Sequence, residues 1–135
     1  MKKVSVEEHN FLAEWAADCA GHVLSRFEEY YPGDDRPRKA IEAARLWAKG
    51  NLTVTKAREY ALAAHAAART AERPASIAAA RSAGHAAATA HVQGHAKHAA
   101  SYAAESAIDP ETETAWQLNK LPDNLKYILS KPLAT

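Results

Sequence analysis

The sequence has 135 residues, of which 17 are Lys or Arg and 16 are Asp or Glu, so its formal net charge is +1 with histidine neutral. This balance argues against a dedicated nucleic-acid binder, which needs a basic excess, and against a strongly acidic mimic of a nucleic acid. Hydrophobic residues make up 47% of the chain and charged residues 24%, as in ordinary globular proteins. We therefore expect a single domain over residues 1–135, with an ordered core at about 5–130.

A first helix is predicted from Ser5 to about Tyr30. Ser5 and Glu8 have the spacing of a capping box, in which each side chain accepts a backbone N–H of the other residue. Asp18 and His22 lie one turn apart, where they can form a local pair. Apolar residues then recur at helical steps and form one stripe, which consists of Leu12, Trp15, Cys19, Val23, Phe27 and Tyr30.

Turn and cap residues delimit the next two helices. Pro37 follows the polar turn 31–36 and suits the first turn of a helix, where its missing N–H costs nothing. Gly50 is the expected stop of this helix after about Lys49. Thr53 is the expected N-cap of a third helix, which ends near residue 72 because a proline at position 74 starts the next one.

Alanine dominates residues 74–108, which predicts helix because alanine has the highest helix propensity. One helix over the whole segment would far exceed the mean length of ~11–12 residues. We therefore expect a break, at Gly94 first and at Gly84 second. On an unbroken helix one face carries Ser82, Thr89, Gln93, Lys97 and Ser101, and the opposite face carries Ile77, Gly84, His91, His95, His98 and Tyr102. The polar face is expected in solvent and the histidine face against protein.

Two short segments are expected at the C-terminal end. Asp109 can cap a helix that holds Ala115, Trp116 and Leu118, and Pro122 interrupts that pattern. A last helix carries Leu125, Ile128 and Leu129, and Pro132 ends the ordered part. Because no segment shows strand-like alternation, the predicted fold is all-α, a single-domain bundle of five to six helices with alanine-rich packing.

The cysteine content and the N-terminus indicate the compartment. Cys19 is the one cysteine, so no disulfide forms within the chain, and a free thiol fits the reducing cytoplasm. Polar residues follow Met1 closely, unlike a signal peptide, and no run approaches the ~18 apolar residues of a membrane span. We therefore expect a cytoplasmic protein without a membrane partner.

Three histidines of the alanine-rich segment are candidate metal ligands. On a continuous helix His91, His95 and His98 project from one face, at spacings that can place imidazoles on a metal. Other histidines that could add a ligand are His85, His65 and His22. The chain has neither a His-Glu-x-x-His motif nor a His-Asp dipeptide. We favour the alternative, in which the histidines form hydrogen bonds between closely packed helices and hold no metal.

A dense polar cluster begins the second predicted helix. It reads Asp34-Asp35-Arg36-Pro37-Arg38, with Glu42 one turn on. Asp35 is expected near the free N–H groups of the helix, and Arg38 is expected to pair with Glu42. Arginine also binds carboxylates and phosphates through paired N–H groups. A capping device and a recognition surface both remain open, and the candidate partner-binding residues are Asp35, Arg36, Arg38 and Glu42.

Nucleophilic catalysis finds little support in the sequence. Cys19 lies on the apolar stripe of the first helix, where a buried cysteine behaves as a small hydrophobe. No nucleophile elbow, phosphate loop or dinucleotide fingerprint is present. We therefore expect no enzymatic activity and no cofactor.

Several strings in residues 10–108 carry a resemblance to a known family. They are Phe11–Ala16 with Asp18–Ala20, Asp35–Ala44, Ala83–Val92, His95-Ala96 and Tyr102-Ala103. With these strings the chain resembles the immunity-five-like family, small all-helical bacterial proteins described as putative immunity proteins. The most specific parts are Arg-Pro-Arg-x-Ala-Ile-Glu and Ala-Thr-Ala-His-Val. The resemblance implies a helical bundle that neutralises a protein toxin by binding it, and it carries over no catalytic residue.

Three function classes follow from these observations. The preferred one is an immunity protein that binds a cognate toxin and neutralises it by occlusion. The alternative is a metal-dependent hydrolase of the helical-bundle type that uses His91, His95 and His98. The third is a structural module that forms a homo-oligomer through its alanine-rich faces.

Overall fold

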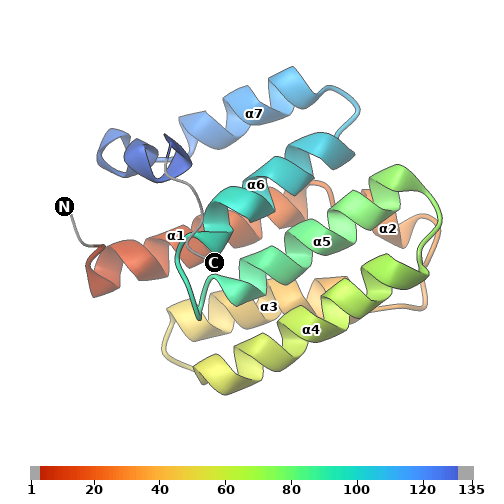
Figure 1. Cartoon of the computed structure of the whole chain (residues 1–135), viewed down its shortest axis with the longest axis horizontal. Helices are drawn as coiled ribbons and strands as arrows, with labels where there is room; N and C mark the ends of the chain where they lie inside the picture. The colour runs from red at the N-terminus through yellow and green to blue at the C-terminus, as the bar shows by residue number, and fades with distance from the viewer. Residues whose placement is uncertain (1–3, 131–135) are drawn as a thin grey trace.

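A computed structural model describes residues 4–130, and in that part it contains seven α-helices, one 3-10 helix and no β-strand (Figure 1). The elements are α1 (Val6–His22), α2 (Ser25–Glu28), α3 (Arg36–Ala48), α4 (Val54–Thr70), α5 (Pro74–Ala88), α6 (His95–Ser106), α7 (Pro110–Asn119) and the 3-10 helix η1 (Asp123–Ser130). The predicted all-α class is confirmed. The predicted number of five to six helices is wrong, because the first predicted helix is split and contributes the short α2.

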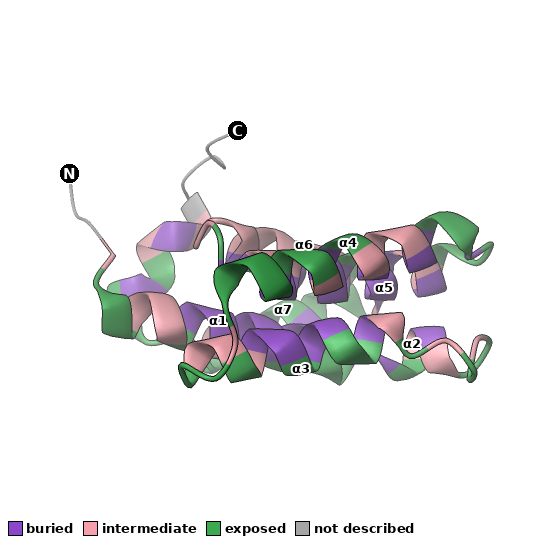
Figure 2. Ribbon diagram, turned by 90° about the horizontal axis from the view of Figure 1, so that it is seen from below, coloured by how far each residue is buried: buried purple, intermediate pink, exposed green. Residues whose placement is uncertain are grey.

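The long helices pack in two layers. α4, α5 and α6 lie side by side in one layer, and α1 and α3 form the other (Figures 1 and 2). α5 lies between α4 and α6 and also contacts α1, α2 and α3. α7 packs against α6. This arrangement makes α5 the central element of the fold.

The capping box at the start of α1 is confirmed, but the helix ends earlier than predicted. The Ser5 hydroxyl accepts the Glu8 N–H at 3.1 Å, and the Glu8 carboxylate accepts the Ser5 N–H at 3.0 Å. α1 ends at His22, just after the weak helix former Gly21, and α2 begins at residue 25. The predicted stripe is buried as far as position 27, through Leu12, Trp15, Cys19, Val23 and Phe27. Tyr30 is 50% exposed and does not belong to the stripe.

The predicted boundaries of the next two helices are confirmed. Gly50 has φ +80°, in the left-handed region that favours glycine, and it follows the end of α3. Asn51 N–H donates to the carbonyl of Leu46 at 2.8 Å across this turn. Thr53 caps α4, since its hydroxyl accepts the Lys56 N–H at 3.2 Å. The proline at position 74 begins α5.

The alanine-rich segment breaks between α5 and α6, immediately before His95, so the break expected at Gly94 is confirmed. The predicted solvent-exposed polar face is wrong for Ser82 and Thr89, which are fully buried, whereas Ser101 of α6 is exposed as predicted. The Ser82 hydroxyl donates to the carbonyl of Ala99 at 2.6 Å, and the Thr89 hydroxyl donates to the carbonyl of its own helix at position 85 at 3.0 Å. Small hydroxyl side chains that find a backbone acceptor can be buried at little cost.

α7 holds Ala115, Trp116 and Leu118 as predicted, but the side chains that it buries are polar. Its cap is as predicted, since Asp109 accepts the N–H of Thr112 at 3.4 Å. The buried side chains of α7 are Glu113 and Gln117. In η1 the predicted Leu125 and Ile128 are buried, whereas Leu129 is partly exposed. The end predicted at Pro132 lies outside the described residues. Within residues 4–130 no helix is both long and apolar enough to cross a membrane.

Candidate functional site

Two groups of side chains outside the apolar core are candidates for function. We call the first the α3-start cluster, which consists of Glu28, Asp34, Asp35, Arg36, Arg38 and Glu42. We call the second the histidine cluster, which consists of His65, His85, His95 and His98. The first contains the partner-binding residues predicted from the sequence, and the second replaces the predicted row of three histidines.

Each arginine of the α3-start cluster is held by a carboxylate through two hydrogen bonds. Arg36 donates from Nε and Nη2 to the two oxygens of Asp34, at 2.9 and 2.6 Å. Arg38 donates from Nε and Nη2 to Glu28 of α2, at 2.9 and 2.6 Å. The hydrogen bond and positive charge of Arg36 lower the pKa of the Asp34 carboxyl below its ordinary value. Both guanidinium groups are therefore fixed in orientation, although their side chains remain 38% and 54% exposed.

Two expected contacts in this cluster are wrong. Asp35 occupies the N-cap position of α3, but its side chain makes no capping hydrogen bond and pairs with Lys39 at 3.4 Å. Asp34 instead accepts the N–H of Arg36 at 3.1 Å. Arg38 forms its paired hydrogen bonds with Glu28 of α2 rather than with Glu42.

The brace between α1 and α3 uses a different arginine from those in the cluster. Arg45 of α3 lies 2.8 Å from Asp18 and 3.3 Å from Glu14 of α1. The expected local pair between Asp18 and His22 is therefore wrong. His22 donates from Nδ1 to Glu113 of α7 at 2.7 Å, and its ring stacks on Trp116 with centroids 3.8 Å apart.

An exposed aromatic residue, Tyr30, follows Glu28 of the α3-start cluster by two positions in the sequence. The guanidinium of Arg73 lies 3.9 Å from the ring centroid of Tyr30, the distance of a cation–π contact. Both residues line a cavity of about 370 Å³ at the start of α5. The neighbouring Tyr31 hydroxyl accepts the Glu72 N–H at 2.8 Å and so ties this chain segment to the end of α4. Arginine and tyrosine are thus presented together at one end of the molecule.

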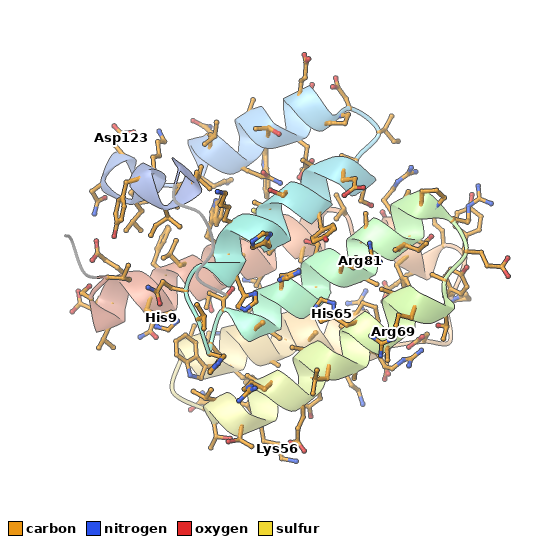
Figure 3. All side chains as sticks on the ribbon, in the orientation of Figure 1. His9, Lys56, His65, Arg69, Arg81 and Asp123 are labelled. Carbon is orange, nitrogen blue, oxygen red and sulfur yellow. The ribbon has the colours of Figure 1, made fainter. Side chains whose placement is uncertain are left out.

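The histidine cluster joins α4, α5 and α6. His85 lies in the middle, with its ring centroid 5.0 Å from His65, 5.1 Å from His95 and 5.3 Å from His98. The Nδ1 atoms of His85 and His95 are 2.9 Å apart, so one ring donates a hydrogen bond to the other. Tyr102 stacks on His85 with centroids 5.4 Å apart. The cluster lies on the face formed by α4, α5 and α6, where Figure 3 labels His65 beside Arg69 and Arg81.

Burial and neighbouring positive charge lower the pKa of three histidines of the cluster, His65, His85 and His95. Burial, and to a smaller extent the charges of His65, His95, His98 and Arg81, together lower the pKa of His85 to about 3. Burial also lowers the pKa of His65, with smaller contributions from Arg69 and Arg81. The pKa of His95 is lowered by burial and by the other histidines. The imidazoles of His65, His85 and His95 are therefore uncharged hydrogen-bonding and stacking groups at neutral pH.

The alternative metal site on His91, His95 and His98 does not form. It required one continuous helix, but α5 ends at Ala88 and leaves His91 exposed in the turn before α6. Among residues 4–130 no three His, Cys, Asp or Glu side chains are arranged so that they could hold a metal ion. The hydrolase that depended on this site therefore has no observation in its favour.

Cys19 is fully buried in the apolar core, as predicted. Burial raises the pKa of its thiol far above the ordinary range, and the nearby charges of Asp18 and Glu113 raise it further. A thiol that stays protonated is a poor nucleophile. Cys19 therefore acts as a core residue.

The sequence did not reveal that His65 and His85 form the centre of the histidine cluster. Gly84 makes this arrangement possible, because a Cβ atom at that position would lie 2.6 Å from the His65 ring. The sequence contains one indication of this contact, a glycine directly before His85, but the ring that fills the space, His65, belongs to another helix. Only the packing of α4 on α5 brings the three residues together.

A comparison with protein families matches residues 2–124 to the family described as Imm-5 like putative immunity protein. The chain belongs to this family. The Imm-5 like match extends beyond the resemblance at residues 10–108 and includes all seven α-helices, the α3-start cluster and the histidine cluster. Comparison with curated proteins and with solved structures finds no match.

Proposed function

We propose that this Imm-5 like protein binds a cognate bacterial toxin in the cytoplasm and neutralises it by occlusion, without catalysis. The family match over residues 2–124 carries this proposal. An occluding protein needs a rigid surface with a few anchor residues that supply most of the affinity, and arginine and tyrosine are prominent among such anchors. It needs neither a nucleophile nor a metal.

The α3-start cluster is the surface that we propose for toxin binding, through Asp35, Arg36, Arg38 and Glu42. Arg36 and Arg38 each use Nε and Nη2 within the chain, so their orientation is set before a partner arrives. Pre-organised side chains lose less entropy on binding. An exposed ion pair adds only ~0.2–1 kcal/mol to folding stability. Stability is therefore a weak reason for two such pairs side by side.

Growth rescue tests the proposal. Each open reading frame adjacent to the gene is induced in a bacterial host, alone and together with this protein. We expect one frame to arrest growth, and we expect co-expression to restore growth and to yield a complex that survives purification. If no adjacent frame arrests growth, or if the arrest persists with the protein present, the proposal is wrong.

Single arginine variants test the surface. Arg36→Ala and Arg38→Ala should weaken toxin binding by at least about tenfold, as expected for anchor residues, and should lower the unfolding free energy by at most ~1 kcal/mol. The matched control is Arg58→Ala, because Arg58 is an exposed arginine of α4 away from this surface. Calorimetric titration and thermal unfolding supply the two readouts. A large loss of stability in either variant, or unchanged affinity in both, would remove the α3-start cluster from the binding surface.

A further inference from the structure

The hydrogen bond between His85 and His95 tolerates protonation poorly. The two Nδ1 atoms lie 2.9 Å apart, and such a contact needs one N–H donor and one unprotonated acceptor. When both rings are positively charged, both Nδ1 atoms carry protons and neither accepts. The contact then changes from a hydrogen bond into repulsion between like charges. It links the α5 and α6 helices where α6 begins.

Apart from the contact between His85 and His95, the beginning of α6 is attached by apolar burial, since Ala96 is fully buried there. Gly94 is its N-cap and supplies no side-chain capping hydrogen bond. The hydrogen bond from Ser82 to the carbonyl of Ala99 lies one turn further along α6. His95 and His98 lie in the first turn, where the positive end of the helix dipole disfavours added positive charge. The first turn of α6 is therefore held on α5 by the buried Ala96 and by the hydrogen bond between His85 and His95, and that bond requires at least one neutral ring.

The groups that surround His85 and His95 do not neutralise the positive charge that an added proton would bring. α4 contributes His65 and Arg69, α5 contributes Arg81, α6 contributes His98 and Tyr102, and the turn before α6 contributes His91. No carboxylate forms a hydrogen bond or an ion pair with any histidine of the cluster in the described part of the chain. The dipole at the end of α5 favours charge on His85, but burial outweighs it and the pKa of His85 still falls to about 3.

We propose that the histidine cluster is an acid-sensitive clasp, which holds the first turn of α6 on α5 at neutral pH and releases it when the cluster takes up protons. Released histidines regain the ordinary affinity of imidazole for protons, so acid favours the open form. The form in which α6 is held on α5 has its full stability above about pH 6.5, and its population decreases as the pH falls below that value. The clasp is separate from the α3-start cluster and from toxin binding.

Site-resolved hydrogen exchange by NMR tests the clasp, with rates corrected for the intrinsic effect of pH. The amides of residues 99–102 are the probe, because their helical acceptors are the carbonyls of residues 95–98. Between pH 7.5 and pH 5.0 we expect their protection to fall at least about tenfold, while the amides of α3 change by less than about twofold. An equal loss in α3, or no loss in residues 99–102, would overturn the proposal.

Substitutions assign the effect to the histidine pair. His85→Asn keeps a polar group near the position of Nδ1 but cannot titrate, so it should remove most of the acid-induced loss in residues 99–102. His95→Asn tests the same bond from α6. The matched control is His91→Asn, because His91 is exposed in the turn, and it should respond to pH as the wild type does. If both His85→Asn and His95→Asn lose protection in residues 99–102 as the wild type does, the proposal is overturned. If neither variant folds, the comparison of α6 with α3 in the wild-type protein decides.

Discussion

Gly84 shows how one missing side chain shapes the contact between two helices. Glycine lowers helix propensity by about 1 kcal/mol relative to alanine, and yet Gly84 is buried inside α5. The ring of His65 occupies the space that a Cβ atom would need, with ring atoms 2.6 Å from the Cβ position. The close packing of α4 on α5 therefore explains why glycine, a weak helix former, occupies position 84.

A double-mutant cycle on this contact is a sharp test. Gly84→Ala alone should lower the unfolding free energy by about 1–2 kcal/mol, because overpacking outweighs the gain in helix propensity. In the background of His65→Ala the same substitution should stabilise the protein by about 1 kcal/mol, because the obstructing ring is absent. Chemical denaturation of the four proteins measures the coupling. Equal effects of Gly84→Ala in both backgrounds would show that the ring moves aside freely.

At the scale of elements, α7 is joined to the rest of the molecule by polar contacts with α1 and α6. Trp15 of α1 donates from Nε1 to the carbonyl of Gln117 at 2.9 Å, and the Gln117 side chain donates to the carbonyl of Ala100 at 2.8 Å. Glu113 accepts from His22 of α1. Buried polar groups that are paired in this way are costly to disrupt, because the partner is left unsatisfied.

Trp15→Ala should therefore strongly destabilise the protein. Trp15 is 2% exposed, and truncation of a buried tryptophan costs about 3–5 kcal/mol. Leu62→Ala is the control, because Leu62 is 69% exposed and its truncation should change stability by less than about 0.5 kcal/mol. Urea unfolding followed by circular dichroism compares the two. Similar losses in both variants would contradict the role of Trp15 as a core residue.

Local signals predicted the starts of α1, α4 and α7, but neither the end of α1 nor the contacts between helices. Ser5, Thr53 and Asp109 were identified as caps because capping depends on residues three positions away. The buried face of α5 was predicted wrongly, since Ser82 finds its acceptor on α6 and only the packed structure reveals that acceptor. Arg38 likewise pairs with Glu28, ten residues away, rather than with Glu42 in its own helix. Partners outside the local helix cannot be inferred from helical periodicity.

For the molecule as a whole, stability arises from helix packing around α5 and from ion pairs and hydrogen bonds between elements. Arg45 joins α3 to α1, and Arg38 joins α3 to α2. Ser76 of α5 donates to the carbonyl of Arg26 at 2.7 Å. These contacts connect α3 to α1 and α2, and α2 to α5, through the side chains of the chain itself.

Because no three His, Cys, Asp or Glu side chains in residues 4–130 are arranged to hold a metal ion, removal of metal ions should leave the stability of the purified protein unchanged. A metal bound only to the native state would raise the melting temperature, and a chelator would reverse that effect. We expect the melting temperature to be the same with and without EDTA, and elemental analysis to find no stoichiometric zinc. A clear fall in melting temperature with EDTA would point to a metal site and would count against the non-catalytic immunity function.

The hydrogen bond between Trp15 and Gln117 also has a consequence during protein synthesis. The two residues are 102 positions apart, so the ribosome makes the donor long before the acceptor. At about 5–20 residues per second the interval is on the order of 5–20 s. During that time α1 exists without the helix that completes its contacts, and the indole N–H of Trp15 has no permanent acceptor. The packing of α1, the first helix to be synthesised, is thus complete only after α7 has been synthesised near the end of the chain.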